Sequence, residues 1–113
     1  MNFRLRLIPL IAAAILALSS LSPASAASQC TASQWREFVS LAKQVDSNLR
    51  RFENARIKDV CRAGRPLLAS LRKADKWIQR HPQCMTARDR RKARRMSAEL
   101  SRASAEFRRG CGR

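Results

Sequence analysis

The apolar positions in the C-terminal three quarters of the chain recur with the spacing of an α-helix. The first stripe alternates steps of three and four residues and consists of Trp35, Phe38, Ala42, Val45, Leu49 and Phe52. Such a stripe is typical of a helix that packs one side against its neighbours. Thr31 and Gln34 match a capping box and predict the start of this helix. The stripe shifts at Ile57 and Val60, and Gly64-Arg65-Pro66 is predicted to end the helix.

Two further helices are predicted from the same kind of pattern. The second is expected to begin at or just before Pro66, which suits a first turn, and to end at His81-Pro82. Its stripe consists of Leu67, Leu71, Ala74 and Ile78, flanked by Leu68 and Trp77. The third has Thr86 as its cap and Gly110 as its terminator, and its stripe consists of Ala93, Met96, Leu100, Ala103 and Phe107. Because no segment here alternates with period two, we expect an all-α fold.

The N-terminal segment differs, because its apolar run from Leu7 to Leu18 is uninterrupted. Two arginines precede the run, and an Ala-x-Ala site ending at Ala26 follows it, as in a secretory signal peptide. The run is shorter than the roughly 20 residues that a bilayer span needs, which disfavours a retained membrane anchor. We therefore predict that residues 1–26 are a cleaved signal peptide and that residues 27–113 form the mature domain; a cut one residue later fits almost as well.

All four cysteines lie in the predicted mature domain, and neighbouring ones are more than twenty residues apart. A zinc site would use close pairs, whereas an even count in a short exported chain is typical of disulfides. In an up-down-up three-helix bundle the first and third helices run parallel, so their starts share one end of the bundle and their finishes the other. Of three pairings, this order predicts Cys30–Cys84 and Cys61–Cys111. A Cys30–Cys61 bridge would join opposite ends of one helix, roughly 40 Å apart.

Positive charge dominates the predicted mature domain, which has 22 basic and eight acidic side chains and a net charge of +14. Such a balance exceeds what solubility requires. Basic residues crowd the third helix and, at 100° per residue, fall opposite its apolar stripe. The candidate anion-binding residues are Arg88, Arg90, Arg91, Lys92, Arg94, Arg95 and Arg102. Arginine suits bidentate contacts with phosphate. The alternative is a face that is only solvated.

Residues for catalysis are sparse. His81 is the only histidine, the cysteines form no close pair, and a glycine-rich phosphate loop is absent. We therefore expect no enzyme activity, cofactor, metal or small-molecule substrate. Trp35 and Trp77 fall on or beside the stripes, so we expect them to pack in the core.

The function that this pattern favours is non-enzymatic binding of anionic partners by an exported protein. The candidates are an envelope polymer, lipopolysaccharide phosphate, anionic lipid at a membrane surface, or an acidic protein. The alanine-rich apolar run and the preference for arginine favour a bacterial protein, periplasmic or secreted. Nucleic acid is disfavoured by export and by the lack of an aromatic platform. Two alternatives remain open: a structural or interaction subunit for a specific protein partner, and a secreted cationic effector that disturbs membranes and would expose an apolar face.

Overall fold

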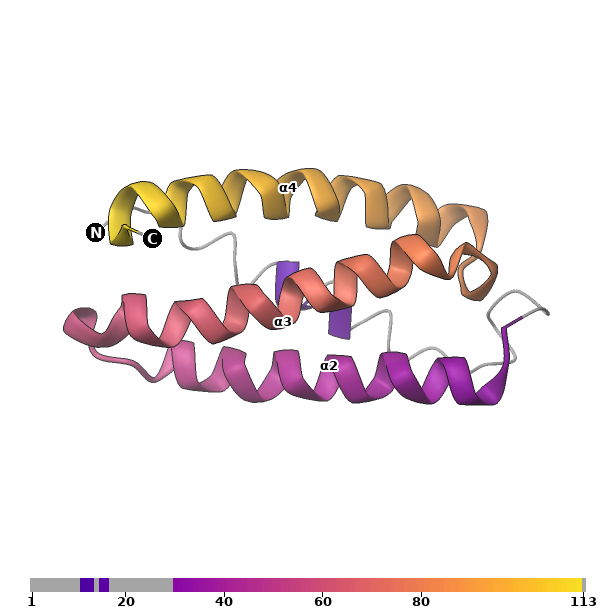
Figure 1. Cartoon of the computed structure of the whole chain (residues 1–113), viewed down its shortest axis with the longest axis horizontal. Helices are drawn as coiled ribbons and strands as arrows, with labels where there is room; N and C mark the ends of the chain where they lie inside the picture. The colour runs from indigo at the N-terminus through magenta and orange to yellow at the C-terminus, as the bar shows by residue number, and fades with distance from the viewer. Residues whose placement is uncertain (1–10, 14, 17–29, 113) are drawn as a thin grey trace.

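A computed structural model describes residues 11–13, 15–16 and 30–112 of this chain, and every regular element in residues 30–112 is helical (Figure 1). The elements in chain order are α2 (Ala32–Glu53), the 3₁₀ turn η3 (Ile57–Asp59), α3 (Val60–Arg80), the 3₁₀ turn η4 (Pro82–Cys84) and α4 (Ala87–Cys111). Within the described ranges no strand occurs, which confirms the predicted all-α class. The predicted cleavage site at Ala26 lies outside the described residues.

Both predicted N-caps are present. The hydroxyl of Thr31 accepts a hydrogen bond from the backbone N–H of Gln34 at 3.0 Å, and the Gln34 side chain accepts one from the N–H of Thr31 at 3.0 Å. These reciprocal bonds are the capping box, and they satisfy two N–H groups that the start of α2 leaves unpaired. At the start of α4, the hydroxyl of Thr86 accepts a hydrogen bond from the N–H of Asp89 at 3.1 Å.

The break between the first two long helices lies upstream of its predicted position. α2 ends at Glu53 and α3 already begins at Val60, so Gly64 and Pro66 lie inside α3. Gly64 is buried against Phe107 on α4, where a larger residue would clash: a Cβ at this position would lie 2.5 Å from Cε2 of Phe107. The change of stripe at Ile57 and Val60 therefore marks the real boundary between the helices.

Pro66 is tolerated in the second turn of α3 although it has no N–H to donate to the carbonyl four residues earlier. Its own carbonyl accepts a hydrogen bond from the Asn48 side chain on α2 at 3.2 Å. The end of α4 also differs from the prediction. The helix continues through Gly110 to Cys111, and Gly112, with a φ of 73°, follows as its C-cap.

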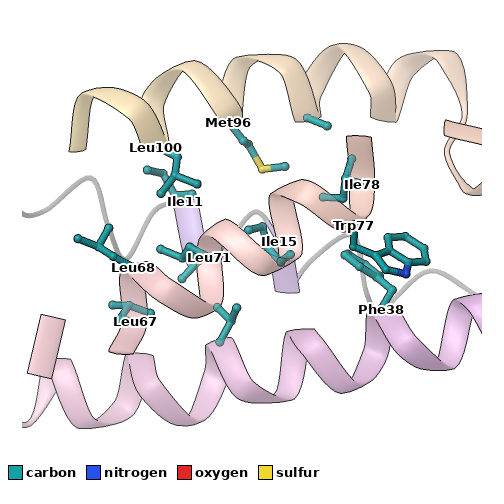
Figure 2. Packing of buried hydrophobic residues seen from close by; sticks show 14 of the residues in the cluster. Ile11, Ile15, Phe38, Leu67, Leu68, Leu71, Trp77, Ile78, Met96 and Leu100 are labelled. Atoms are coloured by element: carbon teal, nitrogen blue, oxygen red, sulfur yellow. The ribbon is translucent and has the colours of Figure 1, made fainter. Parts of the chain in front are cut away.

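α3 lies between α2 and α4 and runs antiparallel to both (Figure 1). Its backbone approaches that of α2 closely along more of its length than that of α4. The predicted stripes are buried, except that Phe52 is only partly buried, and all their buried members but Ala42 belong to one apolar cluster. Ile11, Ala12 and Ile15 from the predicted signal peptide belong to the same cluster (Figure 2). The sequence pattern did not predict that contribution.

Two disulfides join the ends of the helices, with the pairing that helix order predicted. Cys30 is bonded to Cys84, with Cα atoms 4.6 Å apart, and Cys61 to Cys111, with Cα atoms 5.5 Å apart. The predicted helix boundary placed Cys61 near the end of the first helix. In the structure Cys61 lies in the first turn of α3. The pairing is unaffected, because the short connection after α2 keeps the end of α2 and the start of α3 at the same end of the molecule.

Candidate functional site

The candidate site is the outward face of α4. This face points to solvent because the apolar stripe on the opposite side of the helix is buried. Ala93, Met96, Leu100 and Phe107 are all buried against the rest of the domain. Six of the seven predicted anion-binding residues are exposed to solvent, and we call them the α4 basic face: Arg88, Arg91, Lys92, Arg94, Arg95 and Arg102. Packing of the stripe therefore presents these cations together.

Arg90 is the seventh predicted residue, and its environment is different. Its side chain is half-buried, and one guanidinium nitrogen donates to the carbonyl of Met85 at 2.9 Å and to that of Pro82 at 3.3 Å. These bonds link α4 to the turn η4 and satisfy backbone carbonyls there. Arg90 thus stabilises the α3–α4 connection, and its substitution would disturb the fold as well as the charge.

The α4 basic face has no carboxylate partner in the part of the chain that the structure describes. All eight acidic side chains of the chain lie between residues 37 and 106. Among the described residues, the ion pairs join Arg50 to Asp46 on α2 and Arg109 to Glu106 near the end of α4. Neither pair involves a residue of the α4 basic face. Its positive charge is therefore not compensated by any ion pair within the described part of the chain.

Two hollows adjoin this face and share Arg94 and Ala98. A shallow one of about 520 Å³ is lined by Arg91, Arg94, Arg95 and Ala98. A deeper, mainly apolar cleft of about 490 Å³ lies along the seam between α3 and α4, and its wall includes Ile78, Pro82, Ala93 and Arg94. The arrangement places guanidinium groups beside an apolar surface.

Polar side chains in the wall of the α3–α4 cleft form a small network. The hydroxyl of Ser97 donates to the carboxylate of Asp75 at 3.1 Å, and the amide of Gln79 donates to the same carboxylate at 3.0 Å. The sequence pattern did not predict this cleft. Ser97 and Ser101 lie four residues apart beside the apolar stripe and interrupt the run of basic residues. This interruption was the signal in the sequence that could have indicated the cleft.

The two tryptophans pack in the interior, as expected. Phe38 lies between them, with its ring centroid 5.5 Å from Trp35 and 4.9 Å from Trp77. The indole N–H of Trp77 donates to the carboxylate of Glu37 at 3.1 Å. His81 stacks on Trp77 at 4.3 Å and, through Nδ1, lies 2.8 Å from the Trp77 carbonyl, to which it can only donate. His81 therefore closes α3, in a role that packing explains.

Over the described ranges, no helix is both long and apolar enough to cross a membrane. In the same residues, no three histidine, cysteine, aspartate or glutamate side chains gather where they could hold a metal ion. No protein-family model, curated protein or solved structure matches this chain, so its own residues carry the functional argument.

Proposed function

We propose that residues 27–113, released by removal of residues 1–26, form an exported up-down-up three-helix domain that binds anionic partners without enzymatic activity. Two disulfides are typical of proteins that fold in an oxidising compartment, and they support export. The composition favours the periplasm or the surroundings of a bacterium. The proposed ligands are the clustered phosphates or sulfates of an envelope polymer, a lipopolysaccharide or an anionic membrane surface.

The observation that carries this proposal is the α4 basic face, a set of six exposed cations that form no ion pair with any other described residue. Fold stability does not require them there. Arg88 lies in the first turn of α4, where the helix dipole disfavours positive charge. Like charges four residues apart, as in Arg88–Lys92 and Arg91–Arg95, destabilise a helix by roughly 0.2–0.5 kcal/mol per pair. A bound anion would remove this repulsion.

The chemistry of the face favours phosphate over an isolated carboxylate. Three guanidinium groups line the shallow hollow, and each can donate two parallel hydrogen bonds to one oxyanion. A ligand with several phosphates or sulfates would contact several of these groups at once. An acidic protein surface is the alternative partner of the same charge.

The test is a comparison of two variants with four charges removed from each. The first replaces Arg91, Lys92, Arg94 and Arg95 by Gln and leaves Arg90 in place because of its structural role. The control replaces Arg36, Lys43, Arg72 and Lys76 by Gln, which are exposed residues of α2 and α3. Gln is a good helix former, so both variants should keep their helical circular dichroism.

Binding is measured to heparin, to lipopolysaccharide and to vesicles of phosphatidylglycerol, each over a range of salt. We expect the parent to bind all three and to weaken as salt rises, because exposed charges are screened over about 8 Å at physiological ionic strength. The α4 variant should lose at least about tenfold in affinity, as expected when one charge-assisted hydrogen bond is removed, and the control much less. Equal losses would assign binding to bulk charge. No binding by the parent would favour a subunit that recognises a specific protein partner.

A further inference from the structure

The described part of the predicted signal peptide lies inside the folded domain. Ile11, Ala12 and Ile15 are 1%, 0% and 2% exposed and belong to the cluster that α2, α3 and α4 form. In Figure 2, Ile11 and Ile15 lie among residues such as Leu71 and Leu100. Their spacing places them on one side of a helical turn. Aliphatic groups thus fill a space that the three long helices leave open.

This space exists because α2 and α4 lie on opposite sides of α3 and do not close on each other. In Figure 1 the helical residues 11–13 and 15–16 lie behind α3, between the levels of the two outer helices. The bridges Cys30–Cys84 and Cys61–Cys111 fix the helices at both ends. With its ends held, the middle of the domain resists collapse when the occupant is removed.

The residues around this space are apolar. The cluster includes Leu67, Leu71 and Ala74 of α3 and Met96 and Leu100 of α4, and it contains no charged side chain. Empty cavities with such linings stay dry and bind small apolar molecules. Removal of residues 1–26 would therefore leave a site suited to an aliphatic ligand.

We infer that the mature domain uses this site to bind one aliphatic chain of an anionic amphiphile, while the α4 basic face contacts the headgroup. The inference rests on the proposed function and adds an apolar half to it. Lys92 precedes Met96 by one turn on the same side of α4, so a cation of the basic face lies next to the buried stripe. A second copy of the chain is a poorer occupant, because a net charge of +14 on each copy opposes association.

The test uses the exported protein, its N-terminus established by intact mass. It is titrated calorimetrically with dodecyl phosphate, inorganic phosphate and dodecyl maltoside. The two dodecyl compounds are kept below their critical micelle concentrations. We expect dodecyl phosphate to bind at least about 30-fold more tightly than inorganic phosphate, a gain that burial of only a few methylenes of the alkyl chain would give. The heat-capacity change should be negative, as apolar burial requires. Dodecyl maltoside should bind more weakly than dodecyl phosphate.

Two controls test the location. The full chain of residues 1–113, oxidised in vitro, keeps Ile11 and Ile15 in the space, so the advantage of the alkyl chain should fall below about threefold. In the exported protein, Leu71→Trp and Leu100→Trp should each fill the space, raise the melting temperature and remove the advantage. Two variants are used so that one that fails to fold does not decide the result.

The outcomes separate the two proposals. Retained heparin binding without an alkyl-chain advantage would overturn the cavity site and leave the basic face intact. Loss of all polyanion binding would overturn the proposed function. Equal alkyl-chain binding by the full chain would assign the ligand to the α3–α4 cleft and overturn the cavity site. An exported protein that still contains residues 1–26 would also overturn the cavity site, because the space would remain filled.

Discussion

α2 and α4 have the same inward pattern but differ in the charge of their outward faces. Each buries a stripe with steps of three and four residues, and each begins at a threonine cap. α2 carries four basic and three acidic side chains, whereas α4 carries nine basic and three acidic ones. On α2, Asp46 pairs with Arg50, but the cations in the first half of α4 have no carboxylate partner among the described residues. The inward pattern accounts for the fold of both helices, so the charge of α4 needs a separate explanation.

The largest effect is expected from the disulfide that holds α4. Replacing Cys61 and Cys111 by Ser should destabilise the domain more than replacing Cys30 and Cys84, because the backbone of α4 approaches that of α3 less closely than the backbone of α2 does. Loss of a native bridge from a small exported domain typically costs about 2–5 kcal/mol. Urea unfolding followed by circular dichroism measures both losses. Equal losses would show that the difference in packing has no energetic consequence.

A second prediction concerns the contact between α3 and α4. Gly64→Ala should lower the free energy of unfolding by about 1–2 kcal/mol, because its Cβ would overlap the ring of Phe107. Gly110→Ala is the matched control, since nothing lies within 4 Å of its Cβ position. That change should stabilise α4 by up to about 1 kcal/mol through helix propensity. Adding Phe107→Leu to Gly64→Ala should recover part of the loss, and no recovery would refute the steric explanation.

The N-caps allow a direct comparison of the two helix starts. Thr31→Ala removes one half of a reciprocal capping box on α2, and we expect a loss of about 1–2 kcal/mol. Thr86→Ala removes a single bond on α4 and should cost about 0.5–1 kcal/mol. Thermal unfolding of both variants at the same salt concentration provides the measurement. A larger loss at Thr86 would contradict this ranking.

The smallest effect on stability is expected from the charges themselves. Replacing Arg91, Lys92, Arg94 and Arg95 by Gln should raise the free energy of unfolding by about 1 kcal/mol at low salt, because several like-charge pairs disappear. The gain should vanish near 1 M salt, where screening is strongest. The four-charge control on α2 and α3 should gain less. A loss of stability in the α4 variant would mean that the basic face contributes to the fold.

The positions of the helices were predictable where local patterns agree with packing. The stripes of α2 and α4 and both threonine caps were read correctly because each depends on residues within one or two turns. The break before α3 was misplaced because Gly64 and Pro66 look like a stop signal in isolation. Contact with Phe107, 43 positions away in the chain, determines the role of Gly64, and no local rule contains that information.

The candidate site was predictable to a similar extent. Helical geometry alone places six of the seven basic residues on an exposed face. It could not separate Arg90 from them, because the carbonyls that Arg90 binds become its neighbours only through the η4 turn. The cleft between α3 and α4 was also beyond local patterns, since two helices line it.

The sequence by itself determined the helical class, the apolar faces, the disulfide pairing and the excess of positive charge. Each follows from spacing along one helix or from the order of helices, and both are local or topological properties. Only the tertiary structure decided where α2 ends and that Arg90 supports a turn. It alone decided that Ile11 and Ile15 fill a space between the helices. These features depend on which side chains meet across the fold, where packing overrides local preference.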